Sequence, residues 1–459
     1  MNLYGINVDI KNIPELDKDF IPVYKFNQAY LAGAKKPVQI AVERADGQMA
    51  HVDTFIYGTP EMSAADNYYV NRLVKTILWM KGGFRIYVAG DENIYSYLKG
   101  AYAAGGEQDF DYDYMASVFE HPFEVLLVDS APAAKDSPKK MGGHLDGCRI
   151  GFDAGGSDRK VSAVIDGESV YSEEVVWFPK ITADPDYHYD GIVSALKSAA
   201  EHMPKVDAVG VSSAGVYINN RTMNASLFLA VPKELYDSKV KDIYIRAITD
   251  TFGDIPFEVV NDGDVSALAG MMSLGEPNVL GIAMGTSEAV GYVDPEGRIT
   301  GWLNELAFVP VDCAPGAMRD EWSHDIGCGA KYFSQDSVIK LAPRAGIELD
   351  PSLSPAEKLK VVQKLMSEGS KAAADIYLSI GTYLGHSLAY YYDLYGYKYV
   401  LLQGRVMSGQ GGDIIVEEAK RVLSDEYPEI ADVIKITLPD EKFRRLGQSA
   451  AAASLPEVI

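Results

Sequence analysis

Residues 149–160 read RIGFDAGGSDRK, and this stretch decides the expected fold. An apolar strand runs into Asp153, and Gly155, Gly156 and Ser157 follow before a second strand begins. Two glycines allow a tight turn and bring backbone N–H groups close to a ligand, while Asp153 can hold a divalent cation through water. The stretch fits a phosphate-and-metal loop or an ordinary glycine hairpin. It lacks the G-x-x-x-x-G-K-[ST] spacing of a Walker loop.

A second segment repeats this arrangement about 130 residues later, a spacing counted from the sequence. Residues 278–294 read NVLGIAMGTSEAVGYVD, so Gly285 and Thr286 lie between two apolar strands. Two loops of this kind can enclose a nucleoside triphosphate from both sides.

A third segment carries the most reactive side chain. Residues 257–270 read FEVVNDGDVSALAG, which places Asn261 and Asp262 after a buried strand and before a helix. A carboxylate at a strand end is well placed to act as a general base. Asn and Asp are also preferred helix caps, and the sequence leaves both roles open.

The pattern around these segments predicts α/β layers, because strands alternate with helices along the chain. A length of 459 residues suggests two to four domains at roughly 150 residues each. We expect an N-terminal α/β unit at 1–129, a linker rich in Pro, Gly, Ser and Lys at 130–147, a first lobe at 148–260 and a second lobe at 261–459.

Within the N-terminal unit, local signals predict specific elements. Gln39–Glu43 and Met49–Tyr57 are expected to form a hairpin around the turn residues Ala45, Asp46 and Gly47. Ala65–Lys81 has the apolar period of a helix. Phe123–Val128, FEVLLV, is expected to be a buried strand.

Composition excludes several functional classes. The chain carries 42 Lys and Arg against 65 Asp and Glu, a net charge of −23, which disfavours binding to nucleic acid and anionic membranes. There is no run of 18 apolar residues and no signal-peptide pattern at the start. Cys148, Cys313 and Cys328 are sparse and unpaired in the sequence, as in a reduced cytoplasmic protein.

Taken in order, these segments resemble the ROK family of sugar kinases and repressors, within the actin-like ATPase superfamily. GVSSAGVYINNRTMNASLF (210–228) and VLLQGRV (400–406) add to the resemblance, which covers residues 149–459. It implies an α/β fold with two actin-like, ribonuclease H-like lobes around a cleft, preceded by an additional N-terminal α/β unit.

The resemblance also implies roles for individual residues. Asp262 would take the proton from a sugar hydroxyl as that hydroxyl attacks the γ-phosphate of ATP, and Asp153 would orient Mg²⁺ through water. The sugar would be bound by Asn224, Asn261 and Glu305. The nucleotide would be bound by Gly155, Gly156, Ser157, Gly285, Thr286 and Gly404.

Departures from the family pattern qualify these roles. The segment that corresponds to the family's zinc segment, 326–333, retains one Cys of three, so no zinc is expected unless Cys313 and His324 rebuild a site by folding together. Glu288 stands beside the second phosphate loop, where it points away, binds a metal or weakens ATP binding. Asp264 adds further acid near Asp262, and Arg405 follows Gly404 where another Gly is usual.

These observations lead to three hypotheses. The first is an ATP- and Mg²⁺-dependent kinase of a sugar or polyol, and the second is a non-catalytic sugar- or nucleotide-binding protein that retains the kinase fold. The third, a DNA-binding repressor, is disfavoured because the N-terminal unit is acidic and lacks a basic recognition helix. The expected partners are a sugar and ATP, with no nucleic acid or membrane. A homodimer is considered, but the oligomeric state and the sugar stay open.

Overall fold

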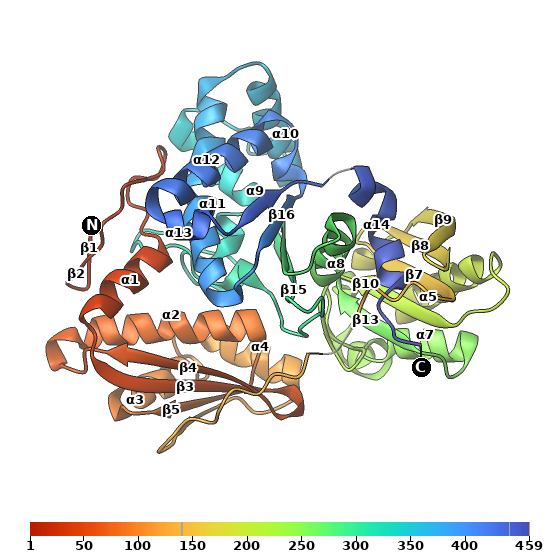
Figure 1. Cartoon of the computed structure of the whole chain (residues 1–459), viewed down its shortest axis with the longest axis horizontal. Helices are drawn as coiled ribbons and strands as arrows, with labels where there is room; N and C mark the ends of the chain where they lie inside the picture. Colours follow the sequence, from red (N-terminus) through yellow and green to blue (C-terminus); the bar gives the residue numbers. More distant parts are fainter. Residues whose placement is uncertain (139–140, 440, 459) are drawn as a thin grey trace. The chain divides into compact units, whose positions relative to one another are not determined.

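The computed structural model describes residues 1–138, 141–439 and 441–458, which form two compact units (Figure 1). Both units are discontinuous in sequence. Unit 1 consists of Met1–Ser137, Ile282–Val290 and Trp302–Leu438. Unit 2 consists of Pro138–Gly281, Gly291–Gly301 and Pro439–Ile459. The domain boundaries expected from the sequence stay predictions, and the expected linker includes residues 139 and 140, which lie outside the described residues.

Unit 2 is built on a five-stranded sheet with the strand order β13-β10-β7-β8-β9. Strands β7, β8 and β9 form an antiparallel meander, and β10 and β13 extend it with parallel pairs. The strands are β7 (Cys148–Ala154), β8 (Asp158–Ile165), β9 (Glu168–Val176), β10 (Ala208–Ser213) and β13 (Phe257–Asn261). A small hairpin joins β11 (Val216–Ile218) and β12 (Arg221–Asn224).

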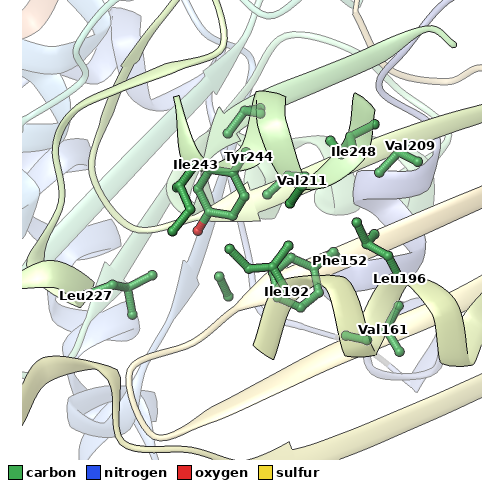
Figure 2. Packing of buried hydrophobic residues seen from close by; sticks show 14 of the residues in the cluster. Phe152, Val161, Ile192, Leu196, Val209, Val211, Leu227, Ile243, Tyr244 and Ile248 are labelled. Atoms are coloured by element: carbon green, nitrogen blue, oxygen red, sulfur yellow. The ribbon is translucent and has the colours of Figure 1, made fainter. Parts of the chain in front are cut away.

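One face of this sheet packs against α5 (Pro185–Ala200) and α7 (Ile243–Phe252). Successive side chains of a strand point to opposite faces, so every second residue of β7 and β10 enters this core. Figure 2 shows Phe152 and Val211 facing Ile192 of α5 and Tyr244 of α7. The short α6 (Lys233–Leu235) precedes α7.

The opposite face packs against α14 (Glu441–Ala453), which also contacts α8 (Asp262–Leu274). Gly151 and Gly210 allow this approach, because a Cβ on either would collide with the α14 backbone at Ser449 or Ala452. All four alanines of Ala450–Ala453, at the end of α14, are buried.

The N-terminal part of unit 1 is a mixed sheet covered by helices. Its strand order is β4-β3-β5-β6. The strands are β3 (Lys36–Arg44), β4 (Gln48–Ile56), β5 (Arg85–Ala89) and β6 (Glu124–Leu127). The helices are α1 (Val23–Gly33), α2 (Ser63–Lys81), α3 (Glu92–Ala101) and α4 (Asp109–Phe119), and β1 (Asn2–Leu3) and β2 (Ile6–Asn7) precede them.

The predicted hairpin and the predicted helix over Ala65–Lys81 are confirmed, with Asp46 in the left-handed conformation at the turn (φ 59°). The prediction of a buried strand at Phe123–Val128 is wrong in its burial. Strand β6 lies at the sheet edge, and Leu126 and Leu127 are exposed. An apolar run alone cannot distinguish an edge strand from a central one.

The remainder of unit 1 contains a second sheet and most of the long helices. The strand order is β15-β14-β16-β17. The strands are β14 (Val279–Met284), β15 (Glu288–Val293), β16 (Tyr399–Gln403) and β17 (Lys435–Thr437), and the ends of β14 and β15 outside Ile282–Val290 belong to unit 2. The helices are α9 (Gln335–Leu341), α10 (Pro355–Ser367), α11 (Lys371–Tyr395), α12 (Gln410–Glu426) and α13 (Pro428–Ala431). Among the described residues, no helix is long and apolar enough to cross a membrane.

Candidate functional site

In unit 2, the predicted acidic residues gather at one edge of the sheet. Strands β7, β10 and β13 are parallel, with Asp153 opposite Ser212 and Ser213 opposite Asn261. The carboxyl ends of parallel strands are where α/β sheets bind ligands. Asp262 begins helix α8 directly after β13, so it lies at the same edge.

The residue that caps helix α8 is Asn261, so the predicted general base, Asp262, is not the helix cap. Asn261 is the N-cap of α8, and its Oδ1 accepts a hydrogen bond from the Gly263 N–H at 2.7 Å. Asp262 is half-buried, and its Oδ1 lies 3.0 Å from the same N–H. Burial raises the pKa of Asp262, against the Gly263 N–H and the charge of Lys180, which lower it. A carboxylate with a raised pKa is a better proton acceptor.

Asp153 is held by a neighbouring strand. The Ser212 hydroxyl donates to its Oδ1 at 3.0 Å. Burial raises the pKa of Asp153 to about 6, with Ser212 opposing the shift and the nearby charge of Asp262 adding to it. A cation bound here would relieve both effects. Mg²⁺ is usually held by one or two carboxylates, with water and phosphate oxygens as its other ligands, so a single carboxylate such as Asp153 fits this ion.

The glycine loop is fastened by the segment that follows β9. The Trp177 indole N–H donates to the Gly155 carbonyl at 2.8 Å, and the Trp177 backbone N–H donates to the Ser157 carbonyl at 3.1 Å. A Cβ built on Gly156 would lie 2.7 Å from Cε and 3.0 Å from Nζ of Lys180. The ammonium group therefore lies over the loop that the sequence assigns to phosphate. Lys180 is not predictable from the sequence, because a single lysine after a strand carries no motif.

Asn224 and Asn261 are brought together through Gly215. The Asn261 side-chain N–H donates to the Gly215 carbonyl at 2.8 Å. Gly215, at φ 138°, lies so close to the Asn224 backbone that a Cβ on it would collide there. The Asn261 side chain and the Asn224 backbone thus both adjoin Gly215 in unit 2. The Asn261 amide already caps α8 and donates to Gly215.

In unit 1, the predicted nucleotide-binding residues also gather. Gly285 and Thr286 form the turn between β14 and β15, and Gly404 follows β16, the neighbour of β14. Gly404, at φ 101°, packs against the Met284 backbone and leaves no room for a Cβ. Arg405 donates to the Thr286 hydroxyl at 2.7 Å, so it ties the two turns together.

A cavity of about 250 Å³ opens beside this group in unit 1. It is lined by α10, α11 and the Gly-rich start of α12, including Gln363, Tyr377 and Gly411. The Gln363 amide donates to the Arg405 carbonyl at 2.8 Å, which connects the cavity to the turn after Gly404. The Tyr377 hydroxyl is buried without a hydrogen-bond partner among the described residues. Ligand pockets usually measure roughly 300–1,000 Å³, so this space suits part of a ligand, such as a base.

Glu288 points into the interior of unit 1. This matches the alternative in which its side chain points away from the phosphate loop. Its side chain is 3% exposed and packs against Gly329. Neither carboxyl oxygen has a hydrogen-bond partner among the described residues. Burial, with a smaller contribution from Glu305, raises the pKa of Glu288 well above its ordinary value. This shift favours the neutral form of Glu288 over a carboxylate beside the predicted phosphate loop.

The remaining predicted residue, Glu305, lies in unit 1 just before a short turn at Leu306–Phe308. Its partial exposure leaves the side chain accessible. The three cysteines are free and buried, and burial raises the pKa of Cys313 to about 12. Within residues 1–138, 141–439 and 441–458, no group of three or more His, Cys, Asp or Glu is placed to hold a metal. The expectation of no zinc stays a prediction.

Comparisons with known proteins now bear on this arrangement. Neither protein-family profiles nor curated protein sequences give a match. Among solved structures, the ROK hexokinase from Thermus thermophilus matches with a TM-score of 0.52 and 17% identity, over 67% of this chain and 96% of the other. The chain has the ROK sugar-kinase fold.

Another protein of this fold matches equally well. A ROK-family transcriptional regulator, a homologue of the E. coli MLC protein, gives a TM-score of 0.51 and 16% identity, over 68% of this chain and 78% of the other. The ROK fold is therefore shared with both a kinase and a regulator, and the fold alone does not choose between them.

Proposed function

We propose that the protein is a kinase that transfers the γ-phosphoryl group of ATP to a hydroxyl of a sugar or polyol, with Mg²⁺. The observation that carries the proposal is the placement of Asp262 outside the helix cap, beside Asp153 at the carboxyl edge of a parallel sheet. The expectation of two actin-like lobes around a cleft, with an additional N-terminal α/β unit, is part of this proposal.

The residues of unit 2 supply the acceptor side of the reaction. Asp262 accepts the proton of the attacking hydroxyl, and its raised pKa suits that role. Asn224 and Asn261 contribute amide groups to the sugar. Asp153, with Ser212 behind it, orients Mg²⁺, which offsets phosphate charge when bound.

Phosphate contacts come from the glycine loop and from a cation that the sequence did not predict. Gly155 and Gly156 form a tight turn whose backbone N–H groups are suited to phosphate, and Ser157 adds an exposed hydroxyl. The Lys180 ammonium adjoins this loop, where it can neutralise phosphate oxygens.

The residues of unit 1 supply the nucleotide side. Gly285, Thr286 and Gly404 form two glycine-containing turns, and the Glu288 carboxyl beside them is buried against Gly329 with a raised pKa. The cavity beside Arg405 is suited to the base. Glu305, which is partly exposed, contributes a carboxylate to the sugar hydroxyls.

The test is ADP release from Mg²⁺-ATP across a panel of hexoses, N-acetylated hexosamines and polyols. Turnover with at least one acceptor, lost when Mg²⁺ is chelated, is the expected result. No turnover with any acceptor, together with calorimetric binding of a sugar or of ATP, would instead identify a binding protein that retains the kinase fold.

A further inference from the structure

The segment that carries Glu305 is hydrogen-bonded to helix α2, which belongs to the N-terminal part of unit 1. The Glu305 backbone N–H donates to the Trp79 carbonyl at 3.0 Å, and the Asn304 N–H donates to the Met80 carbonyl at 2.9 Å. Helix α2 ends at Lys81. The last carbonyls of a helix have no partner within it, so residues 304 and 305 complete the end of α2.

Asn304 is held in a conformation that needs support from its surroundings. Its φ is +52°, in the left-handed region, and its side chain is 2% exposed. The Tyr395 hydroxyl of α11 donates to its Oδ1 at 3.0 Å. Left-handed backbone at a non-glycine residue persists where neighbouring contacts fix it. The orientation of Glu305 therefore depends on contacts from α2 and α11.

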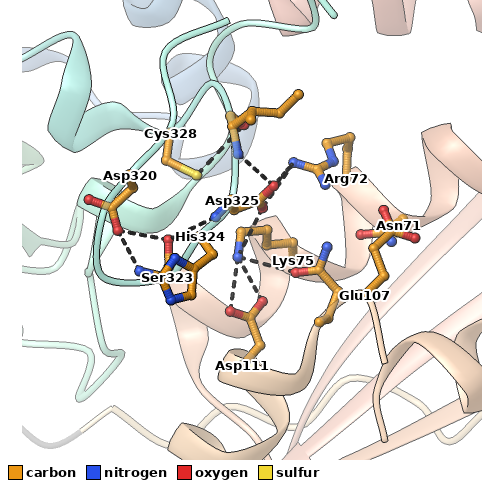
Figure 3. A network of polar contacts seen from close by, with 12 residues as sticks. Asn71, Arg72, Lys75, Glu107, Asp111, Asp320, Ser323, His324, Asp325 and Cys328 are labelled. Carbon is orange, nitrogen blue, oxygen red and sulfur yellow. Dashed lines mark hydrogen bonds and ion pairs between the residues drawn. The ribbon is translucent and has the colours of Figure 1, made fainter. Parts of the chain in front are cut away.

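A buried ion cluster connects α2 to a second loop (Figure 3). Arg72 Nη1 lies 3.2 and 3.0 Å from the two carboxyl oxygens of Asp325. Lys75 Nζ lies 2.8 Å from Asp111 and 3.2 Å from Asp325. Burial acts to raise the pKa of Asp325, but the charges of Arg72 and Lys75 outweigh it and hold the pKa at about 2.

The loop that begins at Asp325 returns to the Glu305 segment. The Gly329 N–H donates to the Val309 carbonyl at 3.0 Å, and the Phe308 N–H donates to the Glu305 carbonyl at 3.1 Å. The Phe308 ring lies 4.2 Å from the Trp79 ring between their centroids. The same helix thus holds the segment directly through its end and indirectly through the loop.

We propose that α2 of the N-terminal layer positions Glu305 for sugar binding, with Arg72 and Lys75 acting through Asp325. The proposal rests on the sugar-binding role proposed for Glu305, and it gives the N-terminal residues a function in the site. The loop that begins at Asp325 also contains Cys328, which lies in the segment that corresponds to the family's zinc segment, 326–333. The ion pairs of Asp325 with Arg72 and Lys75 tie this loop to α2 within unit 1.

The test replaces Asp325 by Asn, which keeps the shape of the side chain and removes the charge that faces both cations. The KM for the sugar is expected to rise about tenfold, the effect of loosening one charge-assisted contact, while the KM for ATP stays unchanged. The matched control is Glu426→Gln, because Glu426 is also a buried acid in unit 1, paired with Lys25 at 2.8 Å. Equal changes in both KM values, or the same sugar effect in the control, would overturn the proposal.

A second readout is independent of turnover. Hydrogen exchange of the Asn304 and Glu305 amides is expected to accelerate in Asp325→Asn and to stay unchanged in Glu426→Gln. Unchanged exchange at both amides in the folded Asp325→Asn protein refutes the positioning role even if the wild type has no kinase activity. An inactive wild type refutes the kinase proposal alone. If Asp325→Asn does not fold, Arg72→Lys retains the charge and loses the two-oxygen contact, and the same outcomes apply.

Discussion

Replacing Asp262 by Asn tests the proposed chemistry most directly, because the structure predicts a large effect on rate and a small one on stability. The cap of α8 is Asn261, so the variant avoids the loss of about 0.5–2 kcal/mol that follows removal of a cap. It loses a negative charge at a helix N-terminus, worth about 0.3–1 kcal/mol. It also removes a carboxylate whose burial is unfavourable. The net change in the free energy of unfolding is expected to stay within about 1 kcal/mol.

Turnover is expected to fall by about 10²–10⁴, the usual contribution of a general base, or about 2.7–5.5 kcal/mol in activation free energy. The assay is ADP release with the best acceptor of the panel, alongside thermal unfolding and calorimetric sugar binding. In the wild type, activity is lost as pH falls through the raised pKa of Asp262, so this acid limb lies above the ordinary Asp value of about 3.9. Asp264→Asn is the control, because Asp264 is buried and accepts from the Tyr292 N–H at 3.0 Å. Wild-type turnover in Asp262→Asn would refute the base assignment.

Three further predictions follow from the same geometry. Lys180→Gln is expected to raise the KM for ATP about tenfold or more, which is the contribution of a charge-assisted hydrogen bond. It should also move the acid limb of the pH–rate profile to higher pH, because Lys180 lowers the pKa of Asp262. An unchanged KM and an unchanged pH profile would contradict this role of Lys180. Gly404→Ala is expected to destabilise unit 1 by more than about 1 kcal/mol and to weaken ATP binding. The control is Gly275→Ala, because Gly275 also has a positive φ but has open space around it. This control should show the smaller loss of stability in thermal unfolding. Asp153 has a pKa of about 6 in the folded protein, so its contribution to the free energy of unfolding falls as pH rises from about 4 to 6, by at most about 3 kcal/mol. In denaturant titrations, Mg²⁺ should restore this lost stability. The same pH dependence and the same Mg²⁺ response in Asp153→Asn would argue against a role of Asp153 in either effect.

Much of the fold follows from local patterns. The hairpin around Asp46 is predictable because turn residues mark it, and helix α2 is predictable because its apolar residues recur at the helical period. Helix α4 was missed, since its sequence DFDYDYMASVF mixes acidic and aromatic residues without a clear apolar stripe. The edge position of β6 depends on which strands pair, which a single strand's sequence does not contain.

The candidate site shows the same division. Asp153 and Asp262 follow parallel strands, so strand-end reasoning places them at one edge. Lys180 reaches the glycine loop through the fold, not through a motif. The burial of Glu288 and the cluster around Asp325 depend on side-chain orientation and on residues far apart in the chain.

The packing of α14 under Gly151 and Gly210 has a consequence for biosynthesis. The strands of the unit 2 sheet are translated first, but α14, which packs on the glycine face of that sheet, is translated only after residues 302–438 of unit 1. About 140 residues separate Gly301 from Pro439, and at roughly 5–20 residues per second their synthesis takes about 7–28 s. During that interval the nascent chain exposes an apolar, glycine-lined sheet face. We expect ribosome-bound chains stalled before residue 439 to recruit holding chaperones and to be cut by protease within unit 2.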